Sequence, residues 1–146
     1  MDLAVFIFSL LMAMGCFWIS SKMIRLYLKV KKWNRVNARV VSKELFIHPK
    51  YSTSRSPYGL KVEYTYEIDG KNYIAHNVYL AELAGGQANH MKSDAEKRLN
   101  KIQERMNVFV DPNDPARTVM YCEGVGLYVF VFFMGILSIL IGISYL

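Results

Sequence analysis

Two long runs without a charged side chain constrain this chain more than any other feature. The first covers residues 3–21 and the second covers residues 124–146. At 1.5 Å per residue, the first run makes about 28 Å of helix, close to the ~30 Å hydrocarbon core of a bilayer. If both runs were buried in a soluble domain, they would need far more protein around them than 146 residues provide. The sequence therefore predicts two transmembrane helices.

The first run differs from segments that are cleaved after export. A secretory signal peptide begins with basic residues, whereas Asp2 is the only early charge here. Residues 13–16 resemble a lipoprotein cleavage site only faintly, because the basic start and the usual Leu three residues before the cysteine are missing. We expect the run to persist as an anchor. We also expect Cys16 and Cys122 to be free thiols, since they would lie at different depths of a helical hairpin.

Seven basic residues lie between Lys22 and Arg39, directly after the first run. The positive-inside rule therefore places the central domain in the cytoplasm, at the bacterial inner membrane, with both termini outside. The first helix is expected to continue to about residue 32, because four of these residues recur at helical spacing: Lys22, Arg25, Lys29 and Lys32. This stripe suits anionic lipid headgroups, each basic residue contributing about 1 kcal/mol. The alternative is a stop-transfer signal without lipid specificity.

Residues 33–122 have the pattern of a small β-rich domain. A first strand is predicted over residues 35–47 and a second over residues 60–69, where apolar and polar side chains alternate. Asp69-Gly70 is a two-residue hairpin turn, because both central positions of such a turn need positive φ. The partner strand is predicted over residues 71–80. A loop is expected over residues 83–88.

A helix and two further strands complete this domain. Residues 93–96 have the capping-box pattern that opens a helix, and Ala95, Leu99, Ile102 and Met106 mark its apolar face. Short strands follow at residues 108–110 and 118–121, joined by a proline-framed turn at residues 111–115. The predicted fold class is an α+β membrane protein. Two transmembrane helices flank a small antiparallel sheet or partly open barrel with one packed helix.

Three segments in this order resemble a known family. They are W-x-x-V-x-A-x-V at residues 33–40, Y-x-Y-x-x-x-G at residues 64–70 and V-x-V-D-P-x-x-P at residues 108–115. The chain resembles a bacterial domain-of-unknown-function family in which membrane helices bracket a small β-domain. Met106-Asn107 stands where that family usually has a glycine. The resemblance implies fold and topology, and it carries no catalytic residues.

Few residues point to enzymatic chemistry, and we predict no catalytic, cofactor or metal site. His48, His76 and His90 lack metal-ligand spacing from one another or from the cysteines. Phosphate-binding, dinucleotide-binding and nucleophile-elbow motifs are missing. Glu63 and Glu67 alternate along one strand, which is typical of the solvent face of an antiparallel sheet.

Other classes are also disfavoured. The basic balance could indicate nucleic-acid binding, but Tyr64 and Tyr66 share the apolar register of Val62 and Ile68, which predicts a core position. A channel is disfavoured because the apolar runs contain no Asp, Glu, Lys, Arg or His. Small residues mark a packing face on each run, with plain lipid contact as the alternative: Ser9 and Ala13 on the first, Gly135, Ser138 and Gly142 on the second.

Two functional hypotheses remain. The first is a non-enzymatic interaction or accessory protein that presents its β-domain at the inner membrane surface. It would contact anionic lipids through the basic stripe. It would contact another membrane protein, or a second copy, through a docking loop containing Tyr51, Arg55 and Tyr58. The second is a membrane-bound enzyme with an unrecognised site. The lack of clustered His, Cys or intramembrane carboxylates favours the first hypothesis.

Overall fold

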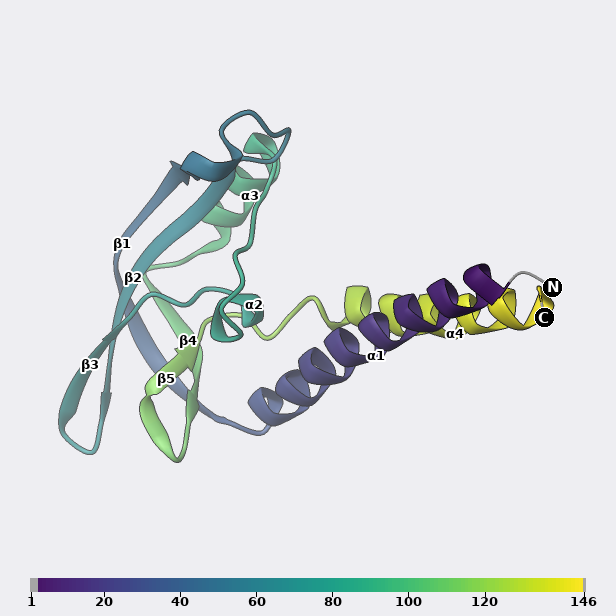
Figure 1. Cartoon of the computed structure of the whole chain (residues 1–146). Helices are drawn as coiled ribbons and strands as arrows, with labels where there is room; N and C mark the ends of the chain where they lie inside the picture. Colours follow the sequence, from purple (N-terminus) through teal and green to yellow (C-terminus); the bar gives the residue numbers. More distant parts are fainter. Residues whose placement is uncertain (1–2, 146) are drawn as a thin grey trace. The chain divides into compact units, whose positions relative to one another are not determined.

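The computed structural model describes residues 3–145, without the side chain of Tyr51. These residues form two compact units. One contains the chain up to Lys29 together with the chain from Gly124, and the other contains Val30–Glu123. The terminal helices are α1 (Leu3–Lys31) and α4 (Val125–Ser144) (Figure 1). Each is long and apolar enough to cross a membrane, and α1 continues past residue 21 as expected.

The two terminal helices contact each other through their small residues. Ser9 and Ala13 of α1 are buried, as are Gly135 and Gly142 of α4. The Ser9 hydroxyl donates to the carbonyl of Val5 at 2.8 Å, so this polar group is satisfied within its own helix. The packing face predicted from residue spacing is therefore the contact between the two helices.

The unit Val30–Glu123 is built on one open antiparallel sheet. Its strands are β1 (Asn34–Ile47), β2 (Tyr58–Ile68), β3 (Lys71–Ala75), β4 (Arg105–Asp111) and β5 (Asp114–Val119), in the order β3-β2-β1-β4-β5. Two helices belong to this unit as well, α2 (Leu80–Leu83) and α3 (Lys92–Lys101) (Figure 1). This confirms the predicted α+β class, with an open sheet and not a barrel.

Alternation along β2 separates the core from the solvent face. Val62, Tyr64 and Tyr66 are buried in the core, while Lys61 and Glu67 are exposed on the other face. The Tyr64 hydroxyl is satisfied by the hydroxyl of Thr118 at 2.7 Å and by the carbonyl of Asn77 at 2.8 Å. These tyrosines are therefore core residues, as predicted, and not a stacking platform.

The turn between β2 and β3 has the predicted geometry. Asp69 and Gly70 both have positive φ, 50° and 75°. The partner strand is shorter than predicted, because it ends at Ala75 and not at residue 80. Val78 and Leu80 are buried outside the sheet, and the short helix α2, which the residue pattern does not predict, forms there.

A bulge divides β1 into two halves. Val40 pairs with Tyr64 and Ser42 with Glu63, so Val41 is an extra residue. The first half pairs with β4, from Asn34 to Arg39. After the bulge, Lys43 shares a row with buried Val62 and reaches α3, where its Nζ donates to the carbonyls of Leu99 and Ile102. These are carbonyls at the C-terminal end of α3, which a cation stabilises.

Helix α3 covers the core face but does not begin as predicted. Its N-cap is Met91, with no side-chain hydrogen bond, and Ser93 lies inside the helix, so the capping-box prediction was wrong. The start is set instead by His90, whose backbone N–H and carbonyl both bond to Tyr58. Ala95 and Ile102 are buried as expected, whereas Met106 belongs to β4.

Candidate functional site

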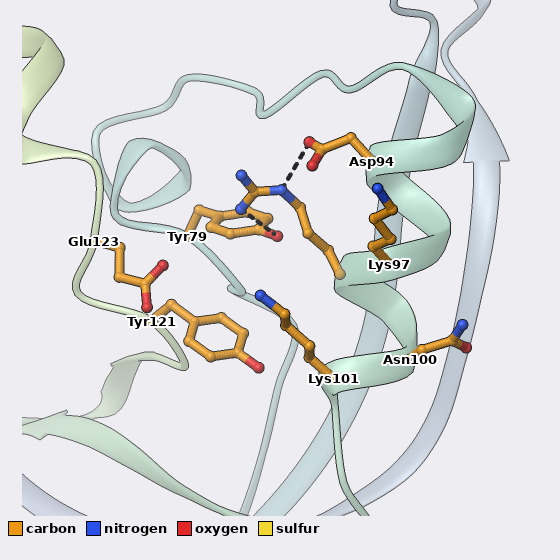
Figure 2. Close-up of a pocket in the computed structure, with 8 residues that line it drawn as sticks. Tyr79, Asp94, Lys97, Asn100, Lys101, Tyr121 and Glu123 are labelled. Atoms are coloured by element: carbon orange, nitrogen blue, oxygen red, sulfur yellow. Dashed lines mark hydrogen bonds and ion pairs between the residues drawn. The ribbon is translucent and has the colours of Figure 1, made fainter.

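One pocket lies between α3 and the two segments that carry Tyr79 and Tyr121. We call it the α3 pocket. It has a volume of about 430 Å³ and is lined by Tyr79, Asp94, Lys97, Arg98, Asn100, Lys101, Tyr121 and Glu123 (Figure 2). The segments carrying Tyr79 and Tyr121 are held together by a β-bridge, and their rings stack with centroids 6.0 Å apart. The aromatic wall is therefore formed by residues 42 positions apart in the sequence.

Ion pairs hold one side of the α3 pocket in place. Arg98 Nε donates to Asp94 Oδ2 at 2.9 Å, and the two residues form an i, i+4 pair along α3. The Arg98 guanidinium also lies over the ring of Tyr79, 5.6 Å from its centroid. The hydrogen bond from Arg98 lowers the pKa of Asp94, so this carboxylate is charged at neutral pH. Burial raises the pKa of Tyr79, which keeps its hydroxyl protonated.

His90 is partly buried and contacts both Asp94 and Tyr79. Its Nδ1 lies 3.2 Å from Asp94 Oδ2, and its ring contacts that of Tyr79 with centroids 5.4 Å apart. Its Nε2 is buried without a hydrogen-bond partner among residues 3–145. Burial lowers the pKa of His90, and nearby Arg98 lowers it further, against the opposing effect of Asp94. The side chain is therefore neutral at pH 7.

The remaining charges of the α3 pocket are two lysines and a glutamate. Lys97 and Lys101 lie one helical turn apart on α3 and are exposed. Figure 2 shows Lys101 reaching toward the side of the pocket that carries Tyr121 and Glu123, and Lys97 rising beside Asp94. No ion pair involves either lysine or Glu123 in the described part of the chain. The pocket therefore offers ammonium groups that are not engaged by carboxylates.

A second feature lies at the end of the sheet where β1 passes into β2, and we call it the loop-end patch. It comprises Ile47, Arg55, Tyr58 and Met91. Ile47 pairs with Tyr58, and Tyr58 forms a bridge with His90, the residue before Met91. Ile47 is 52% exposed and Met91 57% exposed, and Arg55 is exposed in the intervening loop. Two large apolar side chains thus face solvent on segments that flank Tyr58, one at the end of β1 and one at the start of α3.

The docking loop expected from the sequence falls within this region only in part. Arg55 is exposed and Tyr58 is half-buried at the start of β2. Tyr51 lies in a short 3₁₀ helix, Pro49–Tyr51, and its side chain is outside the described residues. Sequence reasoning did not include Ile47 and Met91, because their proximity depends on the bridge between Tyr58 and His90.

The stripe expected to contact lipid headgroups is accessible. Lys22, Arg25 and Lys29 are exposed on α1, and exposed Lys32 follows directly after the helix. The tail Met1-Asp2, expected outside the membrane, and Leu146 lie outside the described residues. Among residues 3–145, no group of three or more His, Cys, Asp and Glu side chains could hold a metal ion.

Fold and features together define a small α+β domain bracketed by two candidate membrane-spanning helices. A family model described as Domain of unknown function (DUF3592) matches residues 36–123, which is more than half of the chain. The protein therefore belongs to this family, as its resemblance predicted. The match includes the α3 pocket and the loop-end patch. Comparisons with curated proteins and with solved structures gave no match.

Proposed function

We propose that this protein is a membrane-anchored, non-enzymatic docking module. In this proposal its β-domain lies at the inner surface of a bacterial membrane and binds another membrane protein there. The observation that carries the proposal is the loop-end patch, where Ile47 and Met91 on segments flanking Tyr58 are each more than half exposed and the intervening loop carries exposed Arg55. Scattered apolar side chains on a surface need no explanation, but two large exposed ones on segments that flank a tyrosine, at the end of the sheet that carries an exposed arginine loop, favour an interface.

The base of the loop-end patch is pre-organised. The N–H of His48 donates to the carbonyl of Pro57 at 2.9 Å and closes the loop. The backbones of Tyr58 and His90 exchange two hydrogen bonds, at 2.8 and 3.2 Å. A partner binding here would order few additional groups, which reduces the entropic cost of association.

The length of β1 separates the loop-end patch from the point where the chain enters the domain. A strand of 14 residues spans roughly 45 Å at about 3.3 Å per residue. Asn34, which follows α1 closely, is at one end of this strand and Ile47 is at the other. Within the domain, the patch is thus remote from the junction with α1, which suits contact with a second protein.

The exposed basic stripe supports the proposed orientation. Lys22, Arg25, Lys29 and Lys32 follow the apolar part of α1, as the positive-inside rule requires for a cytoplasmic domain. In the proposed arrangement, these side chains lie at the anionic inner leaflet. Each of these side chains would contribute about 1 kcal/mol to the attraction between the protein and this leaflet.

The experiment compares two exposed apolar sites by photo-crosslinking in living cells. A photoreactive residue is placed at Met91 or, as a control, at Ile74, which is 63% exposed on edge strand β3. We expect one discrete protein crosslink at position 91 that is lost in an Ile47→Ser/Arg55→Glu background. The same crosslink at position 74, or its survival in that background, would contradict a specific docking surface.

The second candidate function is a membrane-bound enzyme, and the pair His90–Asp94 is the observation that favours it. A carboxylate 3.2 Å from one imidazole nitrogen is the arrangement that orients a histidine for acid–base chemistry. A complementation assay, in which each variant replaces the wild-type protein in the cell, separates the two functions. Glutamine or alanine replacements are made at the side chains best suited to catalysis: His48, Glu63, Glu67, His76, His90 and Cys122. Loss of a catalytic acid or base typically costs 10²–10⁴-fold in rate. If one replacement abolishes complementation in a folded, inserted protein while the Ile47→Ser/Arg55→Glu variant is active, the docking proposal fails.

A further inference from the structure

We infer that the α3 pocket binds the phosphodiester headgroup of an anionic phospholipid. The inference rests on the membrane anchoring proposed above and not on the docking role. The site is distinct from the basic stripe on α1, because all of its lining residues lie between Tyr79 and Glu123. Its volume of about 430 Å³ is in the range of small-molecule binding pockets.

The α3 pocket presents several donors to one ligand. The Tyr79 hydroxyl accepts from Arg98 Nη1 at 3.5 Å, so its own proton can be donated to a phosphate oxygen. The Tyr121 hydroxyl donates to Met106 Sδ at 3.7 Å, and a thioether is a weak acceptor that a phosphate oxygen would replace. Lys101 extends toward the Tyr121 side of the pocket (Figure 2). Neutral and cationic donors therefore converge from α3 and from the aromatic wall.

The charge balance of the pocket fits a monoanion. Three cations and two carboxylates line it, and one carboxylate, Asp94, is engaged by Arg98 and His90. Glu123 opposes a bound anion, and Lys97 and Lys101 outweigh it. The surplus of one positive charge matches a phosphodiester, which carries one negative charge. Inorganic phosphate carries more charge at pH 7 and lacks an acyl glycerol to hold it at a membrane.

Chain connectivity favours a lipid as the source of the phosphate. Glu123 and Tyr121 lie two and four residues before Val125, the first residue of α4. At 3.8 Å per residue, the chain holds the Cα atom of Glu123 within about 8 Å of the start of this apolar helix. The headgroup layer on each side of a bilayer is roughly 5–8 Å thick. A lining residue of the pocket is thus tethered at headgroup depth by covalent geometry alone.

The test uses the full chain in neutral detergent and native mass spectrometry with three probes. These are phosphatidylglycerol, phosphatidylcholine and inorganic phosphate. The test variant is Lys97→Gln/Lys101→Gln. The control is Lys71→Gln/Lys92→Gln, which removes the same charge from exposed positions that do not line the pocket. We expect the test variant to bind phosphatidylglycerol on the order of tenfold more weakly than the control, with phosphatidylcholine binding unchanged.

Three results would overturn the inference. If both variants lost the same affinity for phosphatidylglycerol, the binding would be charge attraction without a specific site. If the test variant lost no affinity, Lys97 and Lys101 would not take part in binding. If inorganic phosphate bound as strongly as phosphatidylglycerol, free phosphate would be the ligand. Melting temperatures show that both variants are folded. Because Ile47→Ser/Arg55→Glu leaves the pocket intact, it should bind phosphatidylglycerol normally, so this test and the docking test fail independently.

Discussion

Gly142 of α4 lies so close to Ser9 of α1 that a Cβ atom built on the glycine would be 2.9 Å from the Cβ of the serine. Real Cβ atoms do not approach a neighbour so closely, and the serine Cβ cannot move without its backbone. The contact between the two terminal helices therefore depends on the missing side chain at this position.

Gly142→Ala should destabilise the helix pair by about 1–3 kcal/mol, because the added methyl group overpacks the contact with Ser9. Gly126→Ala is the matched control, since a Cβ there would meet nothing within 4 Å. In the control, helix propensity should raise stability by up to about 1 kcal/mol. Thermal unfolding in detergent measures both variants. Equal melting temperatures for the two would contradict the packing.

Gly70→Val should lower the stability of the β-domain. The residue has φ of 75° in the hairpin turn, and a β-branched side chain there costs about 1–3 kcal/mol. Gly70→Asn tests the cause, because Asn tolerates this conformation and should recover most of the loss. The melting temperature of the detergent-solubilised protein is the measurement. If Val and Asn variants melt together, backbone conformation is not the reason.

The stability of the folded protein should fall as pH falls below about 6.5, the ordinary pKa of histidine, through the titration of His90. Burial lowers the folded-state pKa of this group, so the unfolded state binds its proton at higher pH. The contribution of His90 is complete above the unfolded pKa and is lost as pH falls toward the folded pKa. Glu82 titrates oppositely, because burial raises its pKa. His90→Gln isolates the effect. The difference in the free energy of unfolding between wild type and variant, measured with urea, should become smaller from pH 8 to pH 5. A difference independent of pH would rule out this titration.

A cysteine at exposed Ser54 tests the proposed topology. In a background without Cys16 and Cys122, Ser54→Cys should resist a membrane-impermeant thiol reagent in intact cells and react after lysis. This expectation follows from the basic residues beside α1. Labelling of intact cells would place the domain outside and reverse the proposed orientation.

Features that depend on near neighbours in the sequence were predictable. The Asp69-Gly70 turn, the register of Tyr64 and Tyr66 and the pair Asp94–Arg98 all follow from spacings of one to four residues. The start of α3 was mispredicted, because two hydrogen bonds between His90 and Tyr58 decide it, and those residues are 32 positions apart. Here these tertiary contacts, and not the local capping pattern, determine where the helix begins.

The α3 pocket could not be predicted as a site for the same reason. Tyr79, Arg98 and Tyr121 come from three segments that no periodicity connects. The residue pattern predicts a strand that includes Tyr79, whereas this residue precedes α2, where the Glu82 carboxylate accepts from the N–H groups of Val78 and Tyr79. The only available signal was the basic group Lys97, Arg98 and Lys101 at helical spacing, which is also typical of any solvated helix face.

The extra residue at Val41 decides where the length of β1 can change during evolution. Deleting Val41 would remove the bulge and leave Ser42 opposite Glu63, so residues 42–47 would keep their present faces. Deleting a paired residue between Ser42 and Ile47 would instead reverse the faces of the residues after it, and such a deletion before Lys43 would take its ammonium group away from the carbonyls of Leu99 and Ile102. Homologous chains should therefore vary at position 41 and in the loop between residues 48 and 57, and keep the spacing from Ser42 to Ile47 constant.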